Sequence, residues 1–213
     1  MISLTKFKRC LILAPHTDDG EFGCGGTIAR LIEEGCEVFY VAFSACEQSV
    51  LPQFPKDILI TEVKEATLRL GIEEKNLTLL KYNVREFNFK RQFILDDLIN
   101  LKKQINPDLV FMPSVNDIHQ DHATITNEGI RAFKFSTIFC YELPWNNFSF
   151  NTTCFITLQQ KHIDLKVNAI QAYQSQAHRT YSHEEFIKGL ARVRGVQAGV
   201  EFAETFEIVR LVL

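Results

Sequence analysis

Short apolar runs alternate with amphipathic stretches through most of the sequence, and this alternation constrains the fold more than any other feature. Runs with the length of buried strands lie at 10–14, 37–44, 77–82 and 108–113. Helical periodicity lies between them, over 28–34, 57–70 and 89–105. Strands that alternate with helices of this length predict right-handed βαβ connections. We therefore predict an α/β fold with a largely parallel sheet and helices on both of its faces.

The second half of the sequence is less regular. Strands are predicted at 137–143, 153–158 and 205–212, and helices at 161–174 and 184–193. The glycines at positions 20, 23, 25 and 26 predict a closely packed turn before the first helix, and their spacing does not match the dinucleotide-binding fingerprint. Residues 47–56, which include two prolines, are the best candidate for a mobile loop. No repeat or linker divides the sequence, so we expect one domain over residues 1–213.

The charge and the cysteine content exclude several classes of protein. A net charge of −3, with scattered lysines and arginines, does not favour a nucleic-acid partner. The six cysteines form no C-x-x-C pair and no disulfide framework, which is typical of a protein in the reducing cytoplasm. No apolar stretch reaches the roughly 18 residues of a membrane span, and the N-terminal apolar run is too short for an export signal. We expect a cytoplasmic protein whose partner is a small molecule.

Two clusters of metal-binding residue types follow two of the predicted strands. Residues 15–19 read Pro-His-Thr-Asp-Asp and come directly after the first strand. Residues 119–122 read His-Gln-Asp-His and follow the strand that includes Met112. In an open parallel sheet the ligand crevice lies beyond the carboxyl ends of the strands. The two clusters, about a hundred positions apart, are therefore expected to converge on one crevice.

The residue types in these clusters suit a hydrolytic metal site. His16, Asp19 and His122 supply three ligands of the kind that zinc takes in catalytic sites, where a further position stays open for water. Fe²⁺ and Mn²⁺ tolerate the same donors. Asp18 is close enough in sequence to accept the proton of that water. His119 is a candidate to stabilise a developing oxyanion or to protonate a leaving amine.

Each aspartate also has a structural interpretation. Asp18 and Asp19 are suited to cap a helix, and Asp121 is suited to cap the helix predicted to begin near His122. For Asp121 we favour a second role, in which its carboxylate orients a ligand histidine through a hydrogen bond.

With these motifs the sequence resembles the PIG-L or LmbE-like family of zinc-dependent N-acetylglucosaminyl deacetylases. The family's Pro-His-Pro-Asp-Asp-Glu motif matches residues 15–19, with Thr17 in place of the second proline and Gly20 before Glu21. Its His-x-Asp-His motif matches residues 119–122. The Gly-Cys-Gly-Gly-Thr-Ile segment at 23–28 and parts of 194–206 are also similar, so the resemblance spans nearly the whole sequence.

The resemblance implies a Rossmann-like fold, a bound zinc ion and removal of the acetyl group from an N-acetylated amino sugar or its conjugate. Carried over by position, it makes His16, Asp19 and His122 the metal ligands. It makes Asp18 the general base and His119 the electrophilic or acid partner. Oligomers are frequent in the family, so it also implies a homo-oligomer.

The substrate side of the site is less clearly marked. Many family members carry an arginine about three residues before the glutamate that we align with Glu62, and this sequence has Leu59 there. Arg85, Lys56 and Arg91 are candidates to replace that arginine, although charged residues outside a motif are more often solvated surface groups. Residues 141–146 form either a substrate-binding wall or part of the core, with three candidate contacts: Glu142, Trp145 and Asn146.

Two other functions are consistent with the sequence. A metal hydrolase of another small amide would use the same residues, and a non-catalytic metal- or sugar-binding module would keep only the ligands. The presence of both Asp18 and His119 favours an enzyme, because a pure binder has no use for proton-transfer groups. A nucleotide-binding oxidoreductase is disfavoured because the glycine spacing differs from the required fingerprint.

Overall fold

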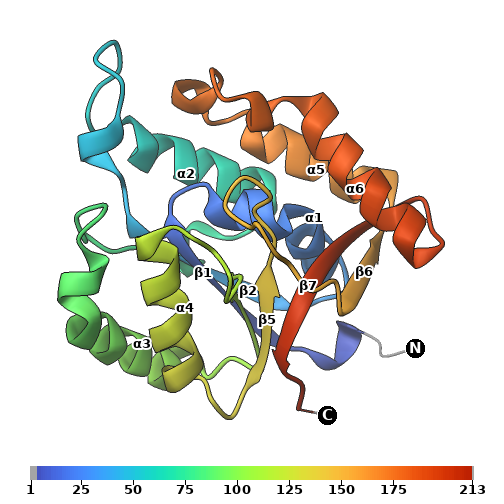
Figure 1. Cartoon of the computed structure of the whole chain (residues 1–213), viewed down its shortest axis with the longest axis horizontal. Coiled ribbons are helices and arrows are strands. Elements are labelled where there is room, and N and C mark those ends of the chain that lie inside the picture. The colour runs from blue at the N-terminus through green and yellow to red at the C-terminus, as the bar shows by residue number, and fades with distance from the viewer. Residues whose placement is uncertain (1–3, 213) are drawn as a thin grey trace.

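The computed structural model describes residues 4–212 and contains one seven-stranded sheet with the order β3-β2-β1-β4-β5-β7-β6 (Figure 1). Strands β1 to β5 run parallel, whereas β7 is antiparallel to both β5 and β6. The prediction of an α/β fold with a largely parallel sheet is confirmed. The strands are β1 (Arg9–His16), β2 (Glu37–Ser44), β3 (Leu77–Leu79), β4 (Leu109–Pro113), β5 (Thr137–Tyr141), β6 (Cys154–Leu158) and β7 (Phe202–Arg210).

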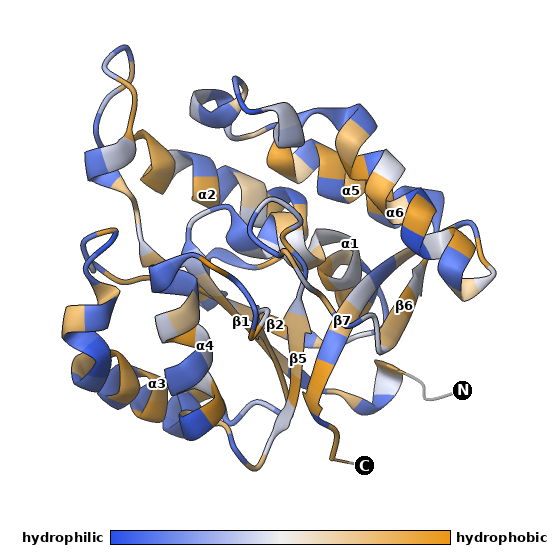
Figure 2. Cartoon of the chain, in the orientation of Figure 1, coloured by the Kyte–Doolittle hydropathy of each residue, from blue (hydrophilic) through white to orange (hydrophobic). Residues whose placement is uncertain are grey.

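Helices cover both faces of the sheet, as predicted. One face carries α1 (Asp19–Glu33), α2 (Ile58–Arg69), α5 (Gln160–Ile170) and α6 (Glu184–Ala198), and the other carries α3 (Arg91–Ile105) and α4 (Gln120–Ala132). Each layer buries its own set of apolar side chains against the strands (Figure 2). Short 3₁₀ helices lie at Leu4–Lys6, Glu47–Ser49, Glu74–Asn76, Phe87–Lys90, Gln174–Gln176 and Thr180–Ser182. None of the helices in the described range is long and apolar enough to cross a membrane.

The strand order reverses between β1 and β4. From β1 the chain passes outward to β2 and β3, whereas β4 is followed by β5 on the opposite side. Loops that leave the carboxyl ends of β1 and β4 therefore diverge and open a crevice between them, which is the usual ligand site of such sheets. Both sequence motifs lie at this reversal, because His16 ends β1 and His119 precedes α4.

The structure corrects the prediction of a glycine-rich turn before the first helix, because the four glycines lie within α1, which begins at Asp19 and is kinked at Cys24. Their role is close packing. A Cβ atom on Gly20 would lie 2.6 Å from Cε2 of Tyr40, and one on Gly23 would lie 2.2 Å from Cδ2 of Tyr141. The helix therefore tolerates glycine's low helical propensity, since only a missing side chain lets the two tyrosines approach.

The last strand begins earlier than predicted. Phe202 and Ala203 already pair with Leu158 and Thr157 of β6, so β7 extends to 202 on its amino-terminal side. Residues 47–56, predicted to be a mobile loop, begin with the 3₁₀ turn Glu47–Ser49 and project from the body of the molecule beside the crevice.

Two glycines of α6 provide a test of close packing against glycines inside a helix. A Cβ atom on Gly195 would lie 2.4 Å from the carbonyl oxygen of Glu201, whereas one on Gly189 would meet nothing within 4 Å. We expect Gly195→Ala to lower the free energy of unfolding by about 1–3 kcal/mol, because backbone must move. Gly189→Ala should leave it unchanged or raise it by up to about 1 kcal/mol. Urea unfolding of both variants measures the difference, and equal effects would contradict the packing role of Gly195.

Candidate metal centre

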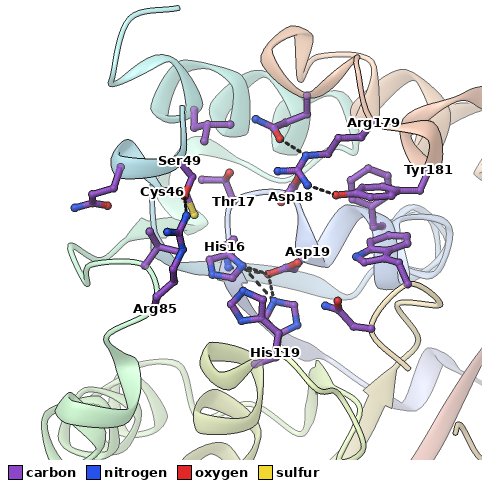
Figure 3. Close-up of a pocket in the computed structure, with 18 residues that line it drawn as sticks. His16, Thr17, Asp18, Asp19, Cys46, Ser49, Arg85, His119, Arg179 and Tyr181 are labelled. Atoms are coloured by element: carbon purple, nitrogen blue, oxygen red, sulfur yellow. Dashed lines mark hydrogen bonds and ion pairs between the residues drawn. The ribbon is translucent and has the colours of Figure 1, made fainter. Parts of the chain in front are cut away.

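Three side-chain atoms from the two motifs converge at the carboxyl ends of β1 and β4. Nδ1 of His16 lies 3.2 Å from Oδ2 of Asp19, which lies 3.2 Å from Nε2 of His122, and the two ring nitrogens are 3.1 Å apart (Figure 3). Ligand atoms held about 2.1 Å from a tetrahedral zinc ion are separated by about 3.4 Å. This triangle of nitrogen and oxygen donors therefore fits a zinc-like ion. A wider cluster of His16, His119 and His122 has ring nitrogens within 4.8 Å of one another.

Buried carboxylates hold the far nitrogens of the two converging rings. Nε2 of His16 lies 3.1 Å from Oδ2 of Asp121, and Nδ1 of His122 lies 2.8 Å from Oδ2 of Asp117. A carboxylate only accepts hydrogen bonds, so each of these ring nitrogens carries the hydrogen. When these rings are neutral, as metal binding requires, the opposite nitrogens, Nδ1 of His16 and Nε2 of His122, carry the lone pairs, and they face each other. This carboxylate–histidine arrangement is the one that orients metal ligands in zinc proteins.

His119 has a different hydrogen-bonding state from the other two histidines. It occupies the N-cap of α4, where its Nδ1 accepts a hydrogen bond of 3.2 Å from the amide of Asp121. An accepting Nδ1 has no hydrogen, so the neutral ring carries its hydrogen on Nε2 and has no lone pair there for a metal. The helix cap thus favours Asp19 over His119 as the third ligand. It also shows that His119, and not Asp121, caps this helix.

Asp121 instead lies buried beneath the site. Its Oδ2 accepts a hydrogen bond of 2.6 Å from the backbone amide of Arg85 as well as the bond from His16. Arg85 has a φ of 70°, and Cys46, which also lines the cavity, has a φ of 51°. Such left-handed backbone costs about 1–3 kcal/mol in residues other than glycine and persists where surrounding bonds impose it. At Arg85 the carboxylate of Asp121 is one such bond.

Asp117 is a functional residue that sequence reasoning missed. It lies in the loop between β4 and α4, where its Oδ1 accepts the backbone amide of His119 at 2.8 Å while its Oδ2 contacts His122. The loop is anchored by Ser114, which donates a 2.7 Å hydrogen bond to the buried carboxylate of Glu207. The only signal in the sequence was an aspartate five residues before His122.

Asp18 lies at the N-cap position of α1, but its side chain makes no capping hydrogen bond. The carboxylate lines the cavity beside the ligand triangle. Burial and the neighbouring charge of Asp19 raise the pKa of Asp18 to about 6. Since the capping alternative for Asp18 finds no support, its carboxylate is available to a molecule in the cavity.

Charges within the cluster shift the pKa values of the other groups in opposite directions. Burial opposes protonation of His16 and His122, but Asp19 and the flanking carboxylates outweigh it, so both pKa values rise, that of His122 to about 10. The two histidines outweigh the effect of burial on Asp19 and lower its pKa. Burial and the two neighbouring histidines lower the pKa of His119 to about 4. His119 is therefore the neutral ring of the group.

The cavity above the triangle has a volume of about 510 Å³ and walls from several loops. Arg85, Trp145 and Asn146, all predicted substrate contacts, line it. The structure does not bring Glu142 to this cavity, because its carboxylate is paired with Arg194 beside a smaller neighbouring pocket. Gln48 and Ser49, from the loop predicted at 47–56, and Gln176 also line it. Three further lining residues were not anticipated from the sequence: Cys46, Arg179 and Tyr181.

A buried polar network supports the loop that carries Asp18. The hydroxyls of Tyr40 and Tyr173 each lie 2.8 Å from the carbonyl oxygen of Thr17, and both also contact the carboxyl group of Glu21. Burial raises the pKa of Glu21 to about 8, and the two tyrosines only partly offset this effect. Glu21 is therefore protonated in the folded protein at neutral pH.

This protonation makes stability depend on pH. Glu21 titrates near 4.5 when solvated and near 8 in the folded protein, so between these values the folded state holds the extra proton. Stability should fall as pH rises through this window, by up to about 1.4 kcal/mol per pH unit. Glu21→Gln, which stays neutral, should flatten the dependence. Urea unfolding of both proteins from pH 5 to 8 with a chelator present tests this, and equal slopes would contradict it.

Comparison with known proteins identifies the family. The family model described as PIG-L, GlcNAc-PI de-N-acetylase, matches residues 11–133, which include both motifs and more than half of the chain. The chain belongs to the PIG-L family. It is 25% identical over 183 residues to the uncharacterized deacetylase YaiS of Escherichia coli K12, covering 81% of this chain and 94% of that protein.

Solved structures share the fold. The N,N'-diacetylchitobiose deacetylase of Pyrococcus horikoshii superposes with a TM-score of 0.82 at 24% identity, covering 97% of this chain and 85% of that one. The 4-carboxy-2-hydroxymuconate hydratase GalB of Pseudomonas putida KT2440 superposes with a TM-score of 0.76 at 18% identity, covering 97% of this chain and 98% of that one. Proteins with this fold thus catalyse more than one reaction, so the reaction of this chain has to be inferred from the residues of its site.

Proposed function

We propose that this protein is a metal-dependent hydrolase that removes the acetyl group from an N-acetylated amino sugar or amino-sugar conjugate. The observation that carries the proposal is the triangle of His16, Asp19 and His122, with Asp18 and His119 beside it in one cavity. Membership of a deacetylase family supports the reaction type. The family description names a GlcNAc conjugate, and the structural relative from Pyrococcus horikoshii is named as a diacetylchitobiose deacetylase, so both names support an amino-sugar substrate.

The donor set fits zinc, and also Fe²⁺ or Mn²⁺. His16, Asp19 and His122 would hold the ion, with Asp121 and Asp117 fixing the two rings. When bound, such an ion supplies a Lewis acid for the amide carbonyl and lowers the pKa of a water molecule toward about 7.

Asp18 and His119 then have separate roles: Asp18 transfers the proton, and His119 donates a hydrogen bond. The Asp18 carboxylate removes a proton from the attacking water and returns it to the nitrogen of the leaving amine as the carbon–nitrogen bond breaks. His119 donates from Nε2 to the carbonyl oxygen as negative charge develops there. The helix cap at Nδ1 supports this donor role, because it keeps the hydrogen of the neutral ring on Nε2, the nitrogen that the cap leaves free. The products are acetate and a free amine.

Variants of the adjacent residues Asp18 and Asp19 distinguish the general base from the metal ligand. Asp18→Asn should retain the metal and lose about 10²- to 10⁴-fold in kcat, because the general base is gone. Asp19→Asn should lose metal affinity. Amine release from a panel of N-acetylated amino sugars, with metal content and chelated protein measured in parallel, tests both. Full activity in metal-loaded Asp18→Asn would remove Asp18 as the base, and no release by wild-type protein would point to another amide or to a binding module.

His119→Asn separates catalysis from helix capping. Asparagine is itself a good N-cap residue, so the variant should unfold like the wild type, but it lacks the ring Nε2–H. We expect kcat to fall about 10²- to 10³-fold with unchanged metal content. The exposed His183, outside the cavity, provides the control variant His183→Ala, which should keep full activity. Loss of the metal in His119→Asn would instead make His119 a ligand.

A further inference from the structure

Arg179 places a guanidinium on the wall of the cavity and, among residues 4–212, has no carboxylate within the 4.0 Å of an ion pair, although its charge acts on the carboxylate of Asp18 in the same cavity. We propose that the substrate carries an anionic group, a carboxylate or a phosphate, which Arg179 binds while the acetamide lies at the histidines. This inference rests on the proposed function, since it specifies which amino-sugar conjugates the same cavity accepts.

A chain of hydrogen bonds holds Arg179 in place. The carboxylate of Glu62 accepts from the backbone amide and the hydroxyl of Ser175, and that hydroxyl contacts the side-chain amide of Gln176 at 3.1 Å. Gln176 in turn accepts a 2.6 Å hydrogen bond from Nε of Arg179. Because Glu62, Ser175 and Gln176 are buried, this chain of hydrogen bonds restrains the position of the guanidinium.

The other side of Arg179 contacts an aromatic wall. Its Nη1 donates to the hydroxyl of Tyr181, whose ring stacks on Trp145 with the ring centroids 3.9 Å apart. Phe22 packs edge-on against both rings. Among residues 4–212, no protein atom forms a hydrogen bond or an ion pair with Nη2, so part of the guanidinium fork is available to a ligand. Figure 3 shows Arg179 and Tyr181 on the cavity wall, with the histidines across the cavity.

The charges of the cavity distinguish an anion from a neutral hydroxyl as the ligand. Elsewhere in the described chain, arginines in ion pairs meet glutamates: Arg30, Arg69, Arg91, Arg131, Arg192 and Arg194. Arg179 and Arg85, the two arginines of the cavity, have no such partner in the range described. The guanidinium of Arg179 is held by the neutral side chains of Gln176 and Tyr181 and has no carboxylate in direct contact, which favours a ligand group that supplies one.

The chain contains a natural reporter of binding at this wall. Trp145 is its single tryptophan and stacks on Tyr181, which contacts Arg179. Tryptophan fluorescence therefore follows ligand occupancy without any turnover. The ligands to titrate are N-acetylglucosamine, its 6-phosphate, its 1-phosphate and N-acetylmuramic acid, which together offer a neutral sugar, two phosphates and a carboxylate. Each is titrated with zinc-loaded and with chelated protein.

We expect at least one anionic ligand to bind about 10- to 100-fold more tightly than N-acetylglucosamine, as charge-assisted hydrogen bonds predict. The preference should persist in chelated protein, which excludes binding of the anion to the metal. Arg179→Gln should abolish it, and Arg179→Lys should retain part of it, because the charge remains without the fork. Arg192→Gln, at an exposed ion pair on α6, should leave it unchanged. The phosphate and muramic acid arms identify the source of the charge.

Two results would overturn the inference: equal affinity for neutral and anionic ligands, or an undiminished preference in a folded Arg179→Gln protein. Thermal unfolding of the variants excludes misfolding as the cause of a loss. Failure of the proposed function looks different, because anionic ligands would still bind with an Arg179-dependent preference while the metal-loaded enzyme released no amine from any of them.

Discussion

The parallel pairing of β1 with β4 at the centre of the sheet is the constraint on which the site depends. Residues 10–12 pair with 109–111, and this register places the end of β1 beside the loop that leads into α4. His16 and His122 reach each other only because of it. The same pairing lets Asp121, at the start of α4, reach back to the ring of His16. The ligand cluster is thus a consequence of strand order and not of either motif alone.

The sequence predicted the sheet and the covering helices because hydrophobic periodicity is a local pattern. It predicted the convergence of the two motifs because the carboxyl ends of parallel strands lie at one edge of the sheet. The sequence could not predict that Gly20 and Gly23 lie in a helix. Glycine is required there because Tyr40 of β2 and Tyr141 of β5 leave no room for a Cβ atom, and these tyrosines are distant in the sequence. Arg179 was missed for a related reason. It lies between two short 3₁₀ turns, in a segment with no periodicity and no motif of its own.

Gly20 and Glu21 also explain how this chain departs from the family motif without losing the site. The absent side chain at Gly20 admits the hydroxyl of Tyr40, which accepts from the Gly20 amide and contacts Glu21. With Tyr173 it encloses the carbonyl of Thr17, the residue that replaces the motif's second proline. Proline would stiffen this turn by fixing φ. Here side-chain hydrogen bonds supply the restraint instead, so Asp18 stays directed into the cavity.

The two ends of the cavity have different structural origins, and this explains why family membership indicates the reaction better than the substrate. The metal end is built at the termini of central strands, where backbone pairing leaves little freedom. The opposite wall comes from the 46–49, 84–85, 145–146 and 176–181 segments, which connect elements and can change without disturbing the sheet. If Arg179 binds an anionic group of the substrate, as proposed above, the 176–181 segment contributes to specificity while the histidines stay in place.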